Sequence, residues 1–293
     1  MANNFVLYHL HTDLSNGTTN IDSCTKYDQY IKRAAELGMT AMAFSEHGNI
    51  FEWVNKKMAI EAAGMKYIHA IEAYITMTLE EKVRDNYHCI LIARNYDGVK
   101  ELNRLFTASY RRNDDNHFYY VPRISMDELE RTSENILITT ACLGGALNSG
   151  NGADRERFQR FCINNKNRVF LEIQHHMVPE QVEYNKHLAS LGKRYGIPLI
   201  AGTDTHSLNE KHAKGRSMLQ KGNKIFFESE ASWDLVFKTY DELCAAYKAQ
   251  GALPHDVWLE AIENTNRMAD MVEPFECDTS HKYPNVFENP NKE

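Results

Sequence analysis

The sequence predicts an α/β fold, a barrel related to the TIM architecture, from two observations. Short runs rich in β-branched and aromatic residues alternate with amphipathic stretches along the 293 residues. Gly38, Gly64 and Gly196 stand where the C-caps of the amphipathic helices would lie. Repeated β-α units of this length favour a parallel sheet, closed or open, and about six or seven detectable strands favour a barrel.

The expected elements follow one another from the N-terminus, where Phe5–Tyr8 is the first strand. Further strands are predicted at Thr40–Phe44, Tyr67–Ile75, His88–Ala93, Ile136–Thr140, Val169–Ile173 and Pro198–Ala201. Helices are predicted at Lys26–Leu37, Glu52–Ala63, Tyr96–Tyr110, Arg155–Asn164, Glu180–Tyr195, Tyr240–Gln250 and Pro254–Met271. We therefore expect a barrel over residues 1–225, a C-terminal helical extension over 226–275 and a linker-like tail over 276–293.

The composition is that of a soluble globular protein, with 43% hydrophobic and 25% charged residues. We expect no membrane span, because the chain lacks a run of about eighteen apolar residues. No signal peptide is recognisable, and the scattered cysteines are typical of reduced thiols, so we expect a cytoplasmic protein. The net charge of −7 argues against a surface that coats nucleic acid in general.

Potential metal ligands follow several of the predicted strands. His9 and His11 end the first strand, and side chains two residues apart on an extended segment point to the same face. In a TIM-like barrel the working residues lie at the C-terminal ends of the strands, where they converge on one cavity. The candidates, all at or near the ends of predicted strands, are His9, His11, His47, Glu72, His88, Cys142, Asp204 and His206.

This set of ligands exceeds what one tetrahedral zinc ion needs. We therefore expect two or three divalent metals that share carboxylate bridges. Imidazole-rich ligation favours zinc, manganese or iron over magnesium, which prefers oxygen ligands. Such a cluster lowers the pKa of a bound water and binds phosphate oxygens, so the predicted chemistry is phosphoester hydrolysis with that water as the attacking group.

A basic segment follows the last pair of candidate ligands. Between Lys211 and Lys224 the chain carries basic residues, Lys214 and Arg216 among them, and no acidic ones. Two interpretations stay open at this point. The segment is either the solvated face of a helix or a phosphate-binding patch beside Asp204 and His206.

The order of the motifs resembles that of the PHP (polymerase and histidinol phosphatase) family. A His-x-His pair comes first, then Glu46-His47-Gly48-Asn49, a glutamate, a later histidine, a cysteine and Asp204-Thr205-His206. The runs 119–124 and 140–145 are similar to the branch found at the N-terminus of bacterial and phage DNA polymerase III α subunits. The resemblance extends from about Phe5 to Tyr283-Pro284.

The resemblance implies a distorted (β/α)7 barrel that holds up to three metals. It assigns His9, His11, Glu72 and Asp204 to one metal, and Glu72 as a bridge to a metal held by His88 and Cys142. It assigns His47 and His206 to another. The family has a further ligand shortly after His-x-His, where this chain has Gly17 and Thr18. Either Asp13 or Asp22 replaces it, or a coordination position stays open. We favour Asp22, which is otherwise a helix N-cap or turn residue.

Other residues are candidates for contacts around the metals. Glu46 is either a partner that orients a ligand imidazole or a surface carboxylate. Arg123 is either a fork-like phosphate clamp or part of a structural salt bridge. One of His175 and His176 can face the cavity, because adjacent strand residues point to opposite faces, and we favour His176 as a substrate contact.

Three functions are compatible with these observations. The leading hypothesis, implied by the resemblance, is a 3′–5′ exonuclease module of a DNA polymerase III α-type protein. Its partners would be a DNA 3′ end, a polymerase core and replisome proteins. The second is a free-standing phosphatase for small phosphomonoesters or nucleotides, which suits the acidic net charge. The third is a catalytically silent domain that supports a polymerase, against which the filled ligand positions argue.

Overall fold

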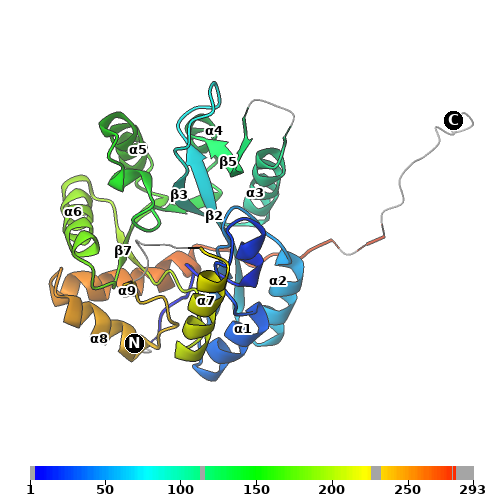
Figure 1. The fold of residues 1–293 in the computed structure, drawn as a ribbon, viewed down its shortest axis with the longest axis vertical. Helices are drawn as coiled ribbons and strands as arrows, with labels where there is room; N and C mark the ends of the chain where they lie inside the picture. Colours follow the sequence, from blue (N-terminus) through cyan, green and yellow to red (C-terminus); the bar gives the residue numbers. More distant parts are fainter. Residues whose placement is uncertain (1–3, 113–115, 226–231, 279, 282–293) are drawn as a thin grey trace, which may run out of the picture.

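The computed structural model describes residues 4–112, 116–225, 232–278 and 280–281. Its strands curl into a barrel-like sheet, and helices form a ring around them (Figure 1). The strands are β1 (Ala41–Phe44), β2 (Lys66–Thr76), β3 (Tyr87–Ala93), β4 (Phe118–Tyr119), β5 (Val121–Ser125), β6 (Ile136–Thr139), β7 (Val169–Gln174) and β8 (Leu199–Gly202). The α/β fold with a TIM-like sheet is thus confirmed.

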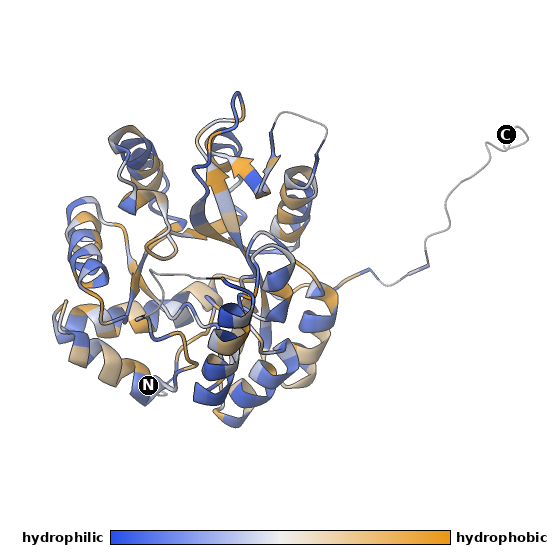
Figure 2. Cartoon of the chain, in the orientation of Figure 1, coloured by the Kyte–Doolittle hydropathy of each residue, from blue (hydrophilic) through white to orange (hydrophobic). Residues whose placement is uncertain are grey.

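The α-helices mix hydrophilic and hydrophobic residues along their length, as amphipathic helices on the outside of a sheet do (Figure 2). No described helix has the length and apolar character that crossing a membrane requires. The α-helices are α1 (Tyr27–Glu36), α2 (Trp53–Ala62), α3 (Tyr96–Ser109), α4 (Met126–Glu130), α5 (Gly152–Asn164), α6 (Pro179–Tyr195), α7 (Glu210–Gly222), α8 (Tyr240–Gln250) and α9 (His255–Asp270). Two short 3-10 helices, η1 (Asp13–Gly17) and η2 (Ala146–Asn148), complete the set.

The sheet is not entirely parallel, which corrects the expected arrangement. The strand order is β4-β5-β2-β3-β6-β7-β8, with β1 paired to β2 off this path. β3 runs antiparallel to both β2 and β6, whereas β1–β2, β2–β5, β6–β7 and β7–β8 are parallel. The physical reason is the connection over 77–86, which contains no helix and therefore returns β3 beside β2 in the opposite direction.

The predicted first strand is present only as isolated bridges. Leu7 pairs with Met42, and Leu10 pairs with Thr205, both in parallel. The amide of Ala43 donates to the Leu7 carbonyl at 2.9 Å, and the amide of His11 donates to the Thr205 carbonyl at 2.9 Å. The N-terminal segment therefore lies between β1 and the residues after β8.

Alternate residues of the strands fill the inside of the barrel. The inner apolar cluster includes Ile68 and Ala70 of β2 and Ile90 and Ile92 of β3, all buried. Residues at the end of α9, among them Met268, join this cluster. The helices of the predicted extension thus share the barrel's core. The division at residue 225 stays a prediction, because residues 226–231 lie outside the described part of the chain, as do 282–293 of the predicted tail.

Candidate metal centre

The candidate ligands continue the inward-facing rows of the barrel strands. Glu72 lies two residues beyond Ala70 on β2, and His88 lies two residues before Ile90 on β3. Because β3 runs antiparallel to β2, the start of β3 and the end of β2 meet at the same end of the barrel. The inside of the barrel is therefore apolar at the α9 end and polar at this end.

The first group of ligand atoms comes from His9, His11 and Asp204. Nε2 of His9 lies 3.1 Å from Oδ1 of Asp204, and Nε2 of His11 lies 3.4 Å from the same oxygen. Asp204 has a φ of 48°, in the left-handed region that non-glycine residues rarely adopt. The turn after β8 thus holds this carboxylate against the His-x-His pair.

The second group comes from His47, Glu72 and His88. Nδ1 of His47 and Nδ1 of His88 each lie 3.0 Å from a different oxygen of Glu72. Cys142 lies next to this group, with Sγ 3.4 Å from Nδ1 of His88, although it belongs to none of the ligand groups found among the described residues. Glu72 also lies 3.2 Å from Nε2 of His11, so it connects the first and second groups.

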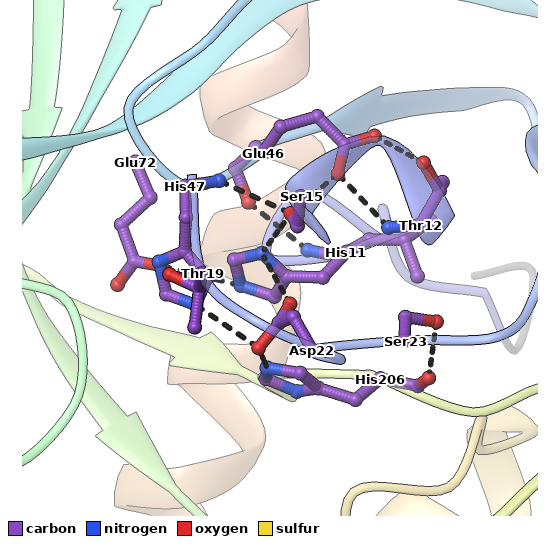
Figure 3. Close-up of polar contacts among 12 residues, drawn as sticks. His11, Thr12, Ser15, Thr19, Asp22, Ser23, Glu46, His47, Glu72 and His206 are labelled. Atoms are coloured by element: carbon purple, nitrogen blue, oxygen red, sulfur yellow. Dashed lines mark hydrogen bonds and ion pairs between the residues drawn. The ribbon is translucent and has the colours of Figure 1, made fainter. Parts of the chain in front are cut away.

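The third group comes from Asp22, His47, His206 and His11. Oδ1 of Asp22 lies 3.2 Å from Nε2 of His206 and 3.5 Å from Nε2 of His47. Asp13, the other candidate for this position, instead accepts a hydrogen bond from Lys26 at 3.0 Å. The structure therefore brings Asp22 into the cluster and leaves Asp13 outside. Figure 3 shows Asp22 between the imidazoles of His206, His47 and His11.

Several buried atoms of the candidate ligands lack hydrogen-bond partners, which suits the binding of cations. Nε2 of His9, Nε2 of His11, Nδ1 of His47 and both carboxylate oxygens of Glu72 are buried without a hydrogen-bond partner among the described residues. Buried polar atoms are normally paired, because leaving one unpaired costs about 1–3 kcal/mol. A donor set of imidazoles and carboxylates suits zinc, manganese or iron. The residues present therefore fit the divalent metals that the sequence predicts.

The charges of the cluster are strongly coupled. Burial alone would raise the pKa of Glu72, but the imidazoles of His88, His47 and His9 hold it well below its ordinary value. Burial alone would lower the pKa of His9, but the carboxylates of Glu172, Asp204 and Glu72 raise it well above its ordinary value. Metal ions compete with these protons, because an imidazole must be neutral to bind a metal.

A buried glutamate that the sequence analysis missed contacts His9 on the side of the ring that faces away from Asp204. Glu172 of β7 is fully buried, and its Oε1 lies 2.5 Å from Nδ1 of His9. The hydroxyls of Tyr8 and Thr139 donate to its Oε2 at 2.9 and 2.7 Å. A Cβ at residue 202 would lie 2.0 Å from Glu172 Oε1, so only glycine leaves room for the carboxylate. Glu172 fixes the His9 ring with Nε2 toward Asp204.

Glu46 supports the site through an intermediate residue. Its carboxylate is 1% exposed and accepts hydrogen bonds from Thr12 and, at 2.6 Å, from Ser15 (Figure 3). Lys56 also donates to it at 2.6 Å. The Ser15 hydroxyl lies 3.3 Å from Nδ1 of His11, and it accepts from the amide of His47 at 3.1 Å. Glu46 is therefore not a surface carboxylate. It holds the η1 turn that places Ser15 against the His11 imidazole and the His47 backbone amide.

The predicted substrate contacts lie in three different environments. The Arg123 side chain is fully buried and donates to the carbonyls of Val83, at 2.6 Å, and Asn116. Arg216 donates through Nε to the Asp22 carbonyl, so it supports a candidate ligand. Lys214 lies exposed on α7. In this structure, therefore, neither Arg123 nor Arg216 is placed as an exposed phosphate clamp. Arg123 also lies 3.8 Å from a carboxylate oxygen of Asp85, so a structural salt bridge is present, and a phosphate contact stays a prediction.

The two adjacent histidines after β7 are both buried. His176 is fully buried and stacks on Trp233, with the ring centroids 5.2 Å apart and an interplanar angle of 13°. His175 packs instead against Tyr247, at 6.1 Å between centroids. Burial, together with the neighbouring His175, lowers the pKa of His176 to about 3, so the ring is neutral at neutral pH. His176 therefore lies on the interior side of the partly exposed Trp233.

A cavity of about 550 Å³ opens onto the cluster of candidate ligands. One wall consists of candidate ligands, and the rest includes apolar and neutral residues. The lining residues are His47, His88, Cys142, Leu143, Gly144, Asn148, Val178, Glu180, Asp204, His206, Ser232 and Trp233. The cluster is thus accessible from outside the barrel, as a site that acts on a substrate must be.

The chain is similar to known proteins. The family model described as the PHP domain matches residues 8–176. The DNA polymerase III subunit alpha of Aquifex aeolicus is 31% identical over 95% of this chain and 25% of its own length, and that of Borreliella burgdorferi is 30% identical over 92% and 24%. The corresponding Thermus aquaticus subunit is 26% identical over 91% of this chain and 22% of its own length.

The chain spans about a quarter of the length of these curated relatives. The family match covers more than half of the chain and includes most of the candidate ligands, from His9 to Cys142. The motif order, the curled sheet and the ligand cluster at one end of it agree with this match. The chain belongs to the PHP domain family.

Proposed function

We propose that the chain is the metal-dependent phosphoesterase module of a DNA polymerase III α-type protein and that it hydrolyses DNA from the 3′ end. The observation that carries this proposal is the cluster itself. Three overlapping groups of imidazoles and carboxylates, buried except for His88, lie together, and His47, His88, Asp204 and His206 of these groups line one open cavity. The similarity to DNA polymerase III α subunits supports a DNA substrate, a polymerase core and replisome proteins as partners, and a place in the cytoplasm.

Two or three bound divalent metals would supply an activated water and stabilise the charge on the phosphate. The residues that would hold them are those of the three groups, with Cys142 beside His88 as a further donor. Glu172 keeps Nδ1 of His9 occupied, so that Nε2 faces the cluster. The Ser15 hydroxyl, which donates to Glu46, likewise contacts Nδ1 of His11 and leaves Nε2 facing the cluster. Arg216 fixes the backbone that carries Asp22.

A specific observation also favours a second candidate, a phosphatase for small phosphomonoesters or nucleotides. No lysine or arginine lines the cavity in the described part of the chain. A long polyanion is usually held by such residues, whereas a single phosphate group needs only the metals. A purely structural role is disfavoured, because the unpaired ligand atoms would be costly in a domain that bound nothing.

The test is a hydrolysis assay on protein reconstituted with manganese, zinc or iron. Labelled single-stranded and duplex DNA are compared with a chromogenic phosphomonoester. We expect shortening from the 3′ end, and we expect Asp204→Asn and His11→Ala to abolish it in folded protein. Hydrolysis of the phosphomonoester alone would favour the second candidate. Wild-type protein without activity on any phosphoester would favour the structural role.

A further inference from the structure

Besides candidate ligands, the cavity lining includes three apolar residues, which we call the Leu143–Val178–Trp233 wall. Leu143, Val178 and Trp233 contribute apolar surface to it. All three side chains are partly exposed, so they are accessible from the cavity. A cavity of about 550 Å³ has room for a ligand of mononucleotide size, since small-molecule sites span roughly 300–1,000 Å³.

The tryptophan of this wall is held in a fixed orientation. The His176 ring stacks nearly parallel on the Trp233 ring from the interior side of the protein. Neither nitrogen of His176 has a hydrogen-bond partner among the described residues, so ring packing is the contact that His176 supplies. Trp233 therefore offers the cavity a pre-ordered aromatic surface, which lowers the entropy lost on binding.

The charges along the cavity give a bound ligand one orientation. The ligand wall, with its imidazoles and candidate metals, attracts phosphate. Apart from the candidate ligands, Glu180 is the charged residue among the described lining residues. A carboxylate at that position disfavours a second phosphate and favours a neutral group.

We propose that the Leu143–Val178–Trp233 wall is a base subsite, in which Trp233 stacks on the nucleobase of the nucleotide whose phosphate lies at the metal cluster. His176 is a positioning residue that holds Trp233. This inference rests on the proposed function and deepens it, because it makes the substrate a terminal nucleotide and not an arbitrary phosphomonoester. Aromatic stacking suits an enzyme that removes any base, since every base has a π-face.

The test measures binding and does not depend on turnover. Manganese-loaded full-length protein is titrated by calorimetry with the 5′-phosphorothioates of deoxyadenosine and of deoxyribose, which share the phosphate and sugar but not the base. We expect the nucleotide to bind at least about fivefold more tightly. Trp233→Ala should remove this preference, and Trp233→Phe should keep most of it. Equal affinities in the wild type, or equal losses for both ligands in Trp233→Ala, would overturn the base subsite.

A matched pair of variants tests the positioning role. His176→Leu and His175→Leu remove neighbouring buried imidazoles that both lack hydrogen-bond partners among the described residues, but the described ring contact with Trp233 belongs to His176. We expect the base preference to fall in His176→Leu and to persist in His175→Leu. Equal behaviour of the two variants would contradict the role of His176. Wild-type protein that shows the base preference but leaves DNA intact would support the subsite and reject the exonuclease.

Discussion

Two buried glutamates on the inside of the barrel differ in what surrounds them. Glu172 and Glu72 are both at most 1% exposed. Glu172 accepts hydrogen bonds from Tyr8, Thr139 and Gln174 and pairs with His9. The two oxygens of Glu72 have no hydrogen-bond partner among the described residues, although they face imidazole nitrogens at 3.0–3.6 Å.

The protein's own side chains satisfy the hydrogen-bonding needs of Glu172. The oxygens of Glu72 instead need bound cations as partners. A carboxylate with several donors is stable inside a protein, whereas one without donors costs free energy until a positive charge reaches it. Glu172 should therefore matter for folding in every condition. Glu72 should matter mainly for metal binding and catalysis, and less than Glu172 for the folding of the metal-free chain.

The largest expected effect on stability comes from Glu172→Ala. The substitution leaves several buried donors unpaired, so we expect a loss of about 3–5 kcal/mol in the free energy of unfolding. Urea denaturation of the chelated protein measures it. A loss below about 1 kcal/mol would show that the Glu172 network does not support the fold.

The matching substitution at the second glutamate is Glu72→Gln. Because a ligand is lost and the shape is kept, we expect hydrolysis to fall by about 100-fold or more, since changing a residue that only orients a metal ligand already costs about 10–100-fold. The chelated variant should lose less unfolding free energy than chelated Glu172→Ala, because removing the unpaired carboxylate oxygens offsets part of the ion pairs lost with the imidazoles. If chelated Glu72→Gln lost as much unfolding free energy as chelated Glu172→Ala, the proposed difference between the two glutamates would be wrong.

The stabilisation by metal should depend on pH. In metal-free protein the raised pKa values of His9 and His47 contribute stability that is present below about pH 6.5 and lost as the pH rises through the folded-state values. The lowered pKa values of Asp22, Glu72 and Asp204 contribute stability that is present above about pH 4 and lost on acidification. Metal binding instead strengthens as the imidazoles lose their protons.

The difference in Tm between metal-loaded and chelated protein should therefore grow from pH 6 to pH 8. Thermal unfolding at several pH values, with a fixed excess of metal, measures it. A difference that shrinks with rising pH would mean that the imidazoles are not the ligands.

The smallest expected effect concerns DNA binding outside the cluster. Lys214→Glu on α7 should weaken DNA hydrolysis severalfold and reduce its salt dependence, because fewer counterions are released on binding. Hydrolysis of a small phosphomonoester should change little. Lys248→Glu, also exposed but on α8, is the matched control and should have no effect. Arg216 is unsuitable for this test, because its substitution would release Asp22.

The sequence was sufficient to predict the ligand cluster, because strand ends and the alternation of side chains determine it. His9, Glu72 and Asp204 lie on different elements, yet the barrel rule places all of them at one end. Metal ligation itself stays a prediction. The antiparallel β3 was not predicted, since the pattern of an apolar strand does not show its direction. β4 and β5 were missed because Phe118–Tyr119 is too short and Pro122 interrupts the pattern.

The roles of the supporting residues could not be predicted from spacing. Glu172 stands within an apolar strand, and that interruption was the one available signal. Arg123 and Arg216 were considered as phosphate contacts, but the structure turns both toward backbone carbonyls of distant segments. Which carbonyl a guanidinium reaches depends on how loops far apart in the sequence meet, and no local pattern records it.

Metal content tests the central claim most directly. Elemental analysis is made on protein purified without chelator, and in parallel on the Glu72→Gln and Asp204→Asn variants. The account predicts at least two zinc, manganese or iron ions per wild-type chain and fewer in both variants, with the fold retained. One metal or none per wild-type chain, or a content unchanged by both substitutions, would contradict it.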